Sequence, residues 1–591
     1  AVGDAGSLIK SLAISQPEGK TLTVSSASGK PAVSLSALTG NASKVISGGA
    51  FSSEVKDYCA AGYTTRAKDD GSGMFDVVGK HEAAIGDVRY ATFADALQNA
   101  KDGDTVSLLR DAEIGYAFIR HAGTIDLGGH TLIGDHSLYN VMYQSSSYGG
   151  DSVLTIQNGT IKCLQGKAPY FDKGTVVYKN LNVISGSPDF SSEAKATYLA
   201  KNASLSKGPH LIVEEDCVLT ACSKTKAYGI DVRGEGSALD LYGTLRISTE
   251  NGAAITGNGS EGEGGTVINI HPSAVVDGGA AGFGIFHPQE GELNVLGGAI
   301  AGATGIEMRS GMLSVSGEAL VTGTASSLDV NPNSNGATTV GAGIAVAQHV
   351  TKHPISVTVS NGTISGYAAL YESNPEKNLS DDLARITLSM TGGTFNAKNN
   401  GEAAVYSEDK VDFITGGAFN KVLDTKYYDE GIYRQNAQDA TDAPGSVVPR
   451  AFEIKYDLGG GMLAGTAKNP ASYTYFDESF TLANPERAGY TFAGWTGSGI
   501  DDGAESVTIA KGSTGDRSFT ATWTVNTDTA YTVEHYQQNL DGTYALAETD
   551  SLTGETDATV TAAPKAYEGF TLNEDAQGTV ASGTIAGDGS L

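Results

Sequence analysis

Two groups of charged residues have the types and spacing to act on a polysaccharide. Asp231 stands between Ile230 and Val232, and Glu307 and Arg309 stand in a second stretch with the same alternation. Side chains of a strand alternate between two faces, so the charged residues would face outward if their apolar neighbours face inward. Lining one groove, they could supply the acid, base and substrate clamp of a polysaccharide lyase or glycoside hydrolase. The alternative, which we favour, is a solvated ladder of charges that pair across strands.

Three tyrosines among serines indicate a second kind of site, one that holds sugars. Tyr139, Tyr143 and Tyr148 occur within residues 136–150. Flat aromatic rings beside hydroxyl groups suit the apolar face and the hydroxyls of a sugar ring. These tyrosines are therefore candidate ligand-binding residues. The alternative is that their rings cover the edge of a sheet.

The other chemically capable residues form no recognised site. The sequence contains no phosphate-binding loop, no Gly-x-Ser-x-Gly elbow and no His-Glu-x-x-His, and it lacks the motifs of polygalacturonase-like hydrolases. The four cysteines lack the spacing of a zinc site. Cys217 and Cys222 are either a disulfide or two buried thiols. We predict no metal ion, no cofactor and no enzymatic activity.

The charge of the chain argues against nucleic acid as a partner. The formal net charge is −29, and only 39 of the 591 residues are Lys or Arg. Neutralising phosphates requires clusters of these cations. The composition fits a well-solvated surface of a secreted protein, or attraction of a cationic partner. No run of roughly 18 apolar residues occurs, so we expect no membrane-spanning helix.

Short apolar stretches between residues 124 and 419 must position the candidate residues. Each unit has three such stretches, separated by Gly, Asn or Ser, and the unit recurs about every 20 to 30 residues, the range typical of solenoids. A strand of three or four residues cannot bury its apolar side alone, so each unit must stack on the next. The sequence therefore predicts an all-β fold, a parallel β-helix with three short strands per coil. The first stretches of five units are 239–241, 268–270, 293–295, 313–315 and 357–359.

Sequence patterns before residue 124 and at residue 419 indicate how the region of short apolar stretches begins and ends. Thr92 can cap a short helix whose apolar residues, from Phe93 to Ala100, would cover the open end of the first coil. The run Val45–Phe51 nearly repeats Phe413–Phe419. We therefore expect residues 1–51 to be the last coils of a preceding β-helix and residues 52–80 to be a small β cap.

The region that begins at residue 81 resembles a known superfamily. The predicted cap helix, the run Asp102–Val106 and the run Ile125–His130 resemble the right-handed β-helices of the pectate-lyase-like superfamily. The resemblance covers residues from about 85 to 420 of an expected β-helix domain at residues 81–437, and it implies an architecture rather than an activity.

Two small modules are expected after a linker at residues 438–450. Residues 451–525 resemble the Listeria–Bacteroides repeat of the internalin B-repeat type, through Phe452–Gly461, Pro485–Trp495 and Phe519–Trp523. The resemblance implies a β-grasp-like surface module. Its core would be built on Tyr490, Phe492 and Trp495, because a domain of this size needs large buried side chains.

Residues 529–591 resemble a mucin-binding-protein (MucBP-type) repeat. The matching stretches are Tyr531–Gln537, Gly542–Tyr544 and Gly569–Leu572. We expect its last strand to be cut off after Leu591.

Together these features predict a bacterial surface protein, secreted or attached to the cell wall through a missing C-terminal region. Host or microbial glycans, including mucin, are the expected partners, and the function would be adhesion or the formation of a stalk. The alternative function is degradation of a polysaccharide in a groove of the β-helix.

Overall fold

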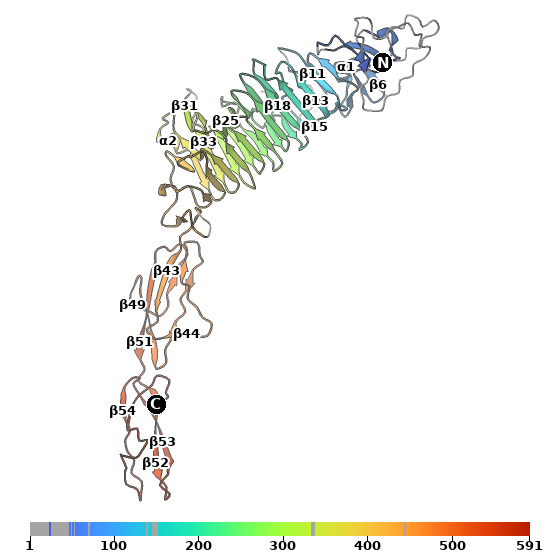
Figure 1. Ribbon diagram of the computed structural model, residues 1–591. Coiled ribbons are helices and arrows are strands. Elements are labelled where there is room, and N and C mark those ends of the chain that lie inside the picture. Colours follow the sequence, from blue (N-terminus) through green and yellow to red (C-terminus); the bar gives the residue numbers. More distant parts are fainter. Residues whose placement is uncertain are drawn as a thin grey trace. The chain divides into compact units, whose positions relative to one another are not determined.

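The computed structural model describes most of the chain (Figure 1). The described residues are 23–24, 46–48, 50–51, 54–68, 71–137, 140–144, 152–201, 204–332, 337–441 and 445–591. They form two compact units, which we treat separately. The first unit is Ala1–Tyr427 with Asn436–Ser446, and the second is Tyr428–Gln435 with Val447–Leu591.

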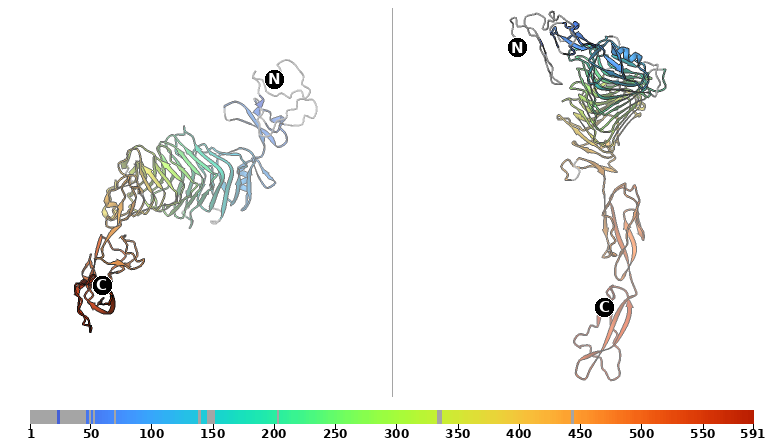
Figure 2. Two further views of the ribbon diagram at one scale, coloured as in Figure 1. Left: turned by 60° about the horizontal axis from the view of Figure 1, so that its bottom comes forward. Right: turned by 90° about the vertical axis from the view of Figure 1, so that its right-hand side faces the viewer.

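The first unit consists of short strands that pair in parallel with the strands one coil earlier and one coil later (Figures 1 and 2). One sheet of 23 strands contains the first and second strands of the coils, and a sheet of 11 strands contains the third strands. The chain is thus nearly all-β with long parallel sheets, as predicted, and the arrangement is compatible with a parallel β-helix. We call this region the stacked coils.

The strands of the stacked coils fall into three sets. First strands are β7 (Thr105–Leu108), β10 (Gly123–Asp126), β17 (His210–Val213), β20 (Ala238–Leu241), β23 (Thr266–Ile270), β26 (Gly291–Val295), β29 (Gly311–Val315), β34 (Ile355–Val359) and β37 (Ile386–Met390). Second strands are β8 (Ala112–Ile114), β11 (Thr131–Gly134), β18 (Val218–Cys222), β21 (Thr244–Ser248), β24 (Val275–Asp277), β27 (Ala299–Gly302), β30 (Leu320–Gly323), β35 (Thr363–Gly366), β38 (Thr394–Ala397) and β40 (Ala418–Phe419). β13 (Val153–Cys163) and β15 (Thr175–Gly186) each span a first and a second strand. Third strands are β9 (Ala117–Ile119), β12 (Met142–Gln144), β14 (Tyr170–Phe171), β16 (Ala194–Ala200), β19 (Ala227–Arg233), β22 (Gly252–Thr256), β25 (Phe283–His287), β28 (Thr304–Met308), β33 (Ala342–Ala347), β36 (Ala368–Ser373) and β39 (Val405–Ser407).

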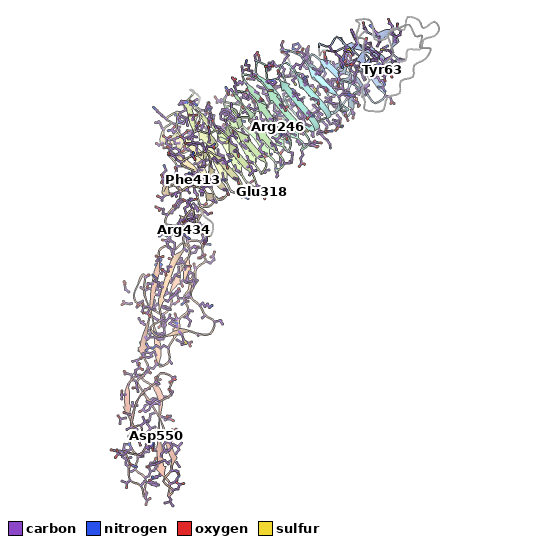
Figure 3. The ribbon with its side chains drawn as sticks, in the orientation of Figure 1. Tyr63, Arg246, Glu318, Phe413, Arg434 and Asp550 are labelled. Atoms are coloured by element: carbon purple, nitrogen blue, oxygen red, sulfur yellow. The ribbon has the colours of Figure 1, made fainter. Side chains whose placement is uncertain are left out.

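The register of the strands puts like residues above one another. Leu239 pairs with Ile268, and Ile268 pairs with Leu293, and all three are buried. The intervening polar residues point outward, where the Asn269 amide donates to the Asp240 carboxylate at 3.0 Å. On β21, Arg246 points outward between two buried residues (Figure 3). The alternation read from the sequence thus gives the correct inner and outer faces of the first strands.

The predicted cap helix is α1 (Phe93–Asn99). The Thr92 hydroxyl accepts a hydrogen bond from the Asp95 amide at 3.0 Å, which satisfies one of the free N–H groups at the helix start. Phe93, Ala96 and Leu97 are buried against the first coil. The hairpin of β5 (Ala83–Ile85) and β6 (Val88–Tyr90) pairs through β5 with β7. A second short helix, α2 (Ser380–Leu383), lies between β36 and β37.

The repeated sequence run adopts the same pairing twice. β2 (Ala50–Phe51) lies parallel to β1 (Thr23–Val24), as β40 lies parallel to β38. A 3₁₀ turn comes after each run, at Lys56–Tyr58 and at Thr425–Tyr427. The Ile46 amide donates to the Tyr58 carbonyl at 3.0 Å, and the Ile414 amide donates to the Tyr427 carbonyl at 2.9 Å. Each run also has an antiparallel partner, β4 (Phe75–Gly79) for β2 and Ser446 for Ala418.

These two stretches are called the closing segments, at residues 46–79 and 414–446. In the first, β4 also pairs with β3 (Tyr63–Ala67). The remaining residues expected in the preceding coils, 1–22 and 25–45, lie outside the described part of the chain.

Of the two alternatives for Cys217 and Cys222, the structure has two separate buried thiols and no disulfide. Cys217 precedes β18 and Cys222 ends it. Five residues of extended chain span about 16 Å at 3.3 Å per residue, whereas a disulfide needs Cα atoms within about 7 Å. Burial raises the pKa of the Cys217 thiol to about 12.

The second unit begins with the hairpin of β41 (Tyr433–Gln435) and β42 (Val447–Pro449), so part of the expected linker is paired. The main element after this hairpin is a five-stranded mixed sheet, in the order β45-β43-β51-β48-β49. Its strands are β43 (Phe452–Asp457), β45 (Ser472–Tyr473), β48 (Tyr490–Gly497), β49 (Ile500–Ala504) and β51 (Arg517–Val525). Two small sheets accompany it, β44 (Met462–Leu463) with β47 (Pro485–Glu486) and β46 (Phe480–Thr481) with β50 (Thr508–Ile509).

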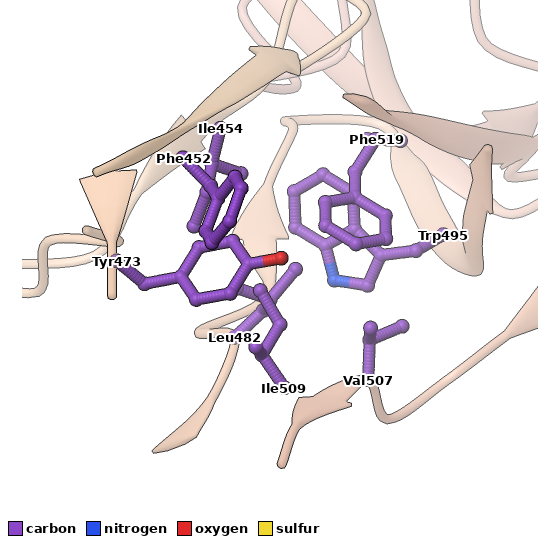
Figure 4. Close-up of a cluster of buried hydrophobic side chains, with 9 residues drawn as sticks. Phe452, Ile454, Tyr473, Leu482, Trp495, Val507, Ile509 and Phe519 are labelled. Atoms are coloured by element: carbon purple, nitrogen blue, oxygen red, sulfur yellow. The ribbon is translucent and has the colours of Figure 1, made fainter. Parts of the chain in front are cut away.

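Trp495 is the centre of this module (Figure 4). It is fully buried, its indole N–H donates to the Asn484 side chain at 2.9 Å, and Phe519 and Phe492 lie against its ring. Of the three aromatic residues expected in the core, Trp495 is therefore buried and Phe492 is partly buried. Tyr490 instead contacts the next module, where its hydroxyl donates to Asp557.

The last module is a long two-stranded ribbon with a small second sheet. β52 (Thr529–Gln538) pairs with β53 (Tyr544–Gly554), and β54 (Thr559–Thr561) pairs with β55 (Ser582–Thr584). A hydrogen-bonded junction joins this module to the preceding one. The Gly489 carbonyl accepts from the Asn526 amide at 3.0 Å and from the Thr556 hydroxyl at 2.8 Å.

We expect Leu482→Ala to destabilise the Trp495 module by about 2 to 5 kcal/mol, because Leu482 is buried in that core and truncation leaves a cavity. Trp495 and Trp523 are the only tryptophans of the chain, so their fluorescence in a urea titration reports this module alone. The control is Met462→Ala, at a side chain 72% exposed. Equal midpoints for the two variants would contradict the assignment of the core.

Candidate functional site

The predicted acidic groove is not a groove, because its three residues are buried. Asp231 and Glu307 are completely inaccessible to solvent, and Arg309 is 4% exposed. Their apolar neighbours Ile230 and Ile306 are buried as well, so β19 and β28 are covered on both faces. The expectation that these charges face solvent is therefore wrong. The residues that cover them come from other parts of the chain.

Asp231 is neutralised by two cations. Arg233 donates from Nε and Nη2 to the two carboxylate oxygens, each at 2.8 Å, and Lys195 Nζ lies 2.8 Å from Oδ2. Burial by itself lowers the pKa of Lys195, but the attraction of Asp231 outweighs it and leaves the pKa above its usual value. This cluster is a closed ion network, which leaves the carboxylate unsuited to act as a base.

Glu307 is held under a hairpin. Arg309 Nε donates to one carboxylate oxygen at 2.7 Å, and the Thr339 amide donates to the other at 3.0 Å. Thr339 belongs to β32 (Ala337–Val340), which pairs with β31 (Asp329–Pro332). The Thr304 hydroxyl donates to the Thr339 carbonyl at 2.6 Å and fixes the hairpin further. Burial raises the pKa of Glu307, although Arg309 opposes this.

The two carboxylates are also too far apart to act together. Asp231 pairs with Thr256, and the same column continues through Phe286 to Glu307, three strands away. Three strand spacings of about 4.8 Å amount to about 14 Å. The carboxyl groups of glycosidases lie about 5 to 9.5 Å apart. The structure therefore pairs Glu307 with Arg309 but does not bring Asp231 close to them.

Tyr143 lies in a row of aromatic rings. It is the middle residue of β12, is partly exposed, and stacks on Tyr170 of β14 with centroids 4.8 Å apart and planes 8° apart. Phe118 of β9 lies against its other side at 5.8 Å. The other two predicted residues, Tyr139 and Tyr148, lie outside the described residues.

The row results from the register of the third strands. Phe118 pairs with Tyr143, Tyr143 with Tyr170, and Tyr170 with Tyr198 of β16, whose ring centroid is 5.0 Å from that of Tyr170. Tyr116, beside Phe118, extends the row with an edge contact at 5.5 Å. We call these five residues the aromatic ladder. Tyr116 and Phe118 are each 41% exposed, so the start of the ladder is accessible to solvent.

Cations stand at the other end of the ladder. Lys195 Nζ lies 4.6 Å from the Tyr198 ring centroid, and the Arg233 guanidinium lies 5.3 Å from it. These are the two residues that bind Asp231, the next position in the column. Their charge is therefore already paired, and the exposed part of the ladder offers mainly ring surface.

The phenols of the ladder remain hydrogen-bond donors at neutral pH. Burial raises the pKa of Tyr143, and the nearby Asp172 adds to this effect. Burial also raises the pKa values of Tyr170 and Tyr198 above that of a free phenol. The faces of Tyr143 and Tyr170 cover each other, so the ladder can contact a sugar through ring edges and donate from its hydroxyls.

Sequence reasoning found only one member of the ladder. The signal for the others is an aromatic residue in the middle of a third strand, as in Ala117–Ile119 and Thr197–Leu199. The lengths of chain between these stretches vary widely, which hides the repeat. The same column ends with another stacked pair, Tyr371 and Tyr406, whose centroids are 5.0 Å apart.

The described residues meet neither the requirements of a metal site nor those of a membrane-spanning helix. Among the residues that the structure describes, no group of three or more His, Cys, Asp or Glu side chains could hold a metal ion. No helix formed by these residues has the length and apolar character needed to cross a membrane.

Comparison of the chain with protein families, with curated proteins and with solved structures finds no match in any of the three.

One buried histidine makes the stacked coils sensitive to acid. His287, at the end of β25, is inaccessible to solvent. Its Nδ1 donates to the Ser310 carbonyl at 3.1 Å, and its Nε2 has no hydrogen-bond partner among the described residues. Burial lowers the pKa of His287 to about 4, so the ring is neutral in the folded protein.

We expect the free energy of unfolding of the stacked coils to fall by about 2 to 3 kcal/mol between pH 7 and pH 4.5 through His287 alone. The unfolded chain takes up a proton near pH 6.5, whereas the folded chain does so only near pH 4, so stability is lost as the pH falls. Urea titrations followed by circular dichroism should show a flatter pH dependence for His287→Gln. The surface variant His121→Gln should keep the wild-type slope, and equal slopes for all three proteins would refute this assignment.

Proposed function

We propose that this chain is a non-enzymatic bacterial surface protein, secreted or attached to the cell wall, that binds glycans along the aromatic ladder. In this proposal the stacked coils are a right-handed parallel β-helix, and the two small modules are β-grasp-like and MucBP-like repeats that form a stalk. The observation that carries the proposal is the ladder itself, a row of aromatic rings in contact with one another whose first members are accessible to solvent.

The spacing of the ladder suits a linear glycan lying along the axis of the coils. Successive strands lie about 4.8 Å apart, so each coil offers one ring to the ligand. The ring edges can make apolar contacts with the faces of sugar rings, and the adjacent hydroxyls fix orientation. Each contact is weak, but a chain that touches several rings gains from their number.

The charge distribution favours neutral sugar faces as ligands. The chain carries a formal net charge of −29, which repels strongly anionic glycans. Lys195 and Arg233, the cations nearest the ladder, are held by Asp231. Neutral stretches of host or microbial glycans, including those of mucin, are therefore the proposed ligands.

The second unit supports the proposal of a stalk. Thr529 and Thr556, at the junction of its two modules, are buried, and their hydroxyls lie 2.6 Å apart. Gly489 has φ of +77°, and a Cβ there would lie 2.4 Å from Gly587 Cα. A junction with buried hydrogen bonds and no room for a side chain resists bending between the modules.

We expect Tyr143→Ala and Tyr170→Ala each to weaken glycan binding by roughly two- to tenfold, the value of one aromatic contact. The test is a glycan array of neutral plant and mucin oligosaccharides, probed with the whole chain, and then titration of the best ligand. The matched control is Phe476→Ala, an aromatic residue 43% exposed in the Trp495 module. The proposal fails if the wild-type chain binds no glycan, or if both ladder variants bind as the control does.

A further inference from the structure

A polar cleft lies between the first closing segment and the first coil. It has a volume of about 250 Å³ and is open to solvent. β3 contributes Thr64, Thr65 and Arg66 to its lining, and the coil contributes Glu82, Arg110 and Glu113. None of these residues belongs to the aromatic ladder. Sites for drug-sized ligands usually exceed about 300 Å³, so this cleft has room for one small molecule or one sugar unit.

Two guanidinium groups converge in this cleft. Arg66 Nη1 and Arg110 Nη1 both donate to the carbonyl oxygen of Asp111, at 3.2 and 3.1 Å. Two cations that share one acceptor atom lie within about 6 Å of each other, since each donor is one hydrogen-bond length away. An anion placed between them would relieve their repulsion and could accept from both.

The Glu82 carboxylate pairs with Arg110 and is not recorded in contact with Arg66. Glu82 accepts from Arg110 Nη2 at 3.0 Å through one oxygen and from the Phe93 amide at 3.0 Å through the other. Its two oxygens are thus engaged with Arg110 and with the start of α1. Arg110 Nε is buried and has no hydrogen-bond partner among the described residues. A buried donor without an acceptor costs about 1 to 3 kcal/mol, which an added acceptor would recover.

The charged and hydroxyl side chains that line the cleft indicate which kind of anion it could bind. Glu82 and Glu113 lie on the same lining as the two arginines, so a singly charged anion that contacts both guanidinium groups meets less repulsion than a doubly charged one such as phosphate. A single carboxylate fits the forked geometry of guanidinium groups. Thr64 and Thr65 place hydroxyls on the same lining, where they can bind hydroxyls of the ligand.

We propose that this cleft binds a small hydroxylated monocarboxylate, such as a sugar acid. Its carboxylate contacts Arg66 and Arg110, and its hydroxyls contact Thr64 and Thr65. The site is separate from the ladder, so the chain can hold a neutral glycan and an acidic sugar at once.

The test is isothermal titration of the whole chain with glucuronate, glucuronamide and inorganic phosphate. Glucuronate should bind, and glucuronamide, which has the same shape without the charge, should bind at least about tenfold more weakly. Arg66→Gln should weaken glucuronate binding by a similar factor. Lys68→Gln removes one positive charge that lies near Asp76, outside the cleft lining, and should change nothing.

Several outcomes would overturn the proposal. These are no binding of glucuronate by the wild-type chain, equal binding of glucuronamide, tighter binding of phosphate, and equal effects of Arg66→Gln and Lys68→Gln. If Arg66→Gln does not fold, Thr64→Val serves instead and should weaken glucuronate binding by several-fold. Tyr170→Ala should leave glucuronate binding unchanged, which separates this site from the one on the ladder.

Discussion

The structure depends on one constraint, that no coil can bury its apolar residues without the coils on either side. Each strand forms backbone hydrogen bonds with the corresponding strand of the next coil. The register of one pair of strands therefore sets the register of the pairs that follow. Leu239, Ile268 and Leu293 are buried for this reason, and Asp240 and Asn269 are outside for the same reason. Function is therefore confined to outward positions and to the segments between strands.

This constraint explains how much of the fold can be predicted from the sequence. The apolar stretches, the helix after Thr92 and the repeated runs that end at Phe51 and Phe419 are local patterns, and each forms the expected element. The inner and outer faces of the first strands also result from alternation alone. A pattern over a few residues is enough to predict a side chain's inner or outer position wherever that side chain contacts only the coils themselves.

The candidate site was harder to predict because it depends on distant residues. Alternation places Asp231 and Glu307 on the outer face, but it does not reveal that Lys195 and the hairpin at Thr339 cover them. Those partners lie 36 and 32 residues away in the sequence. The ladder was missed for a related reason, since its rings meet only after third strands of irregular spacing are aligned. Cysteine spacing alone leaves a disulfide and two thiols open at Cys217 and Cys222, because it does not show that the stretch between them is extended.

The two closing segments carry a consequence for how such chains can evolve. The same pairing ends one set of strands before α1 and another before the second unit, so the segment forms next to two quite different neighbours. In each case the short strand that ends the run, β2 or β40, has a parallel partner on one side and an antiparallel partner on the other. Recombination at this boundary could therefore exchange whole domains without exposing hydrophobic surface, and tandem architectures would arise from gene fusion with few compensating mutations.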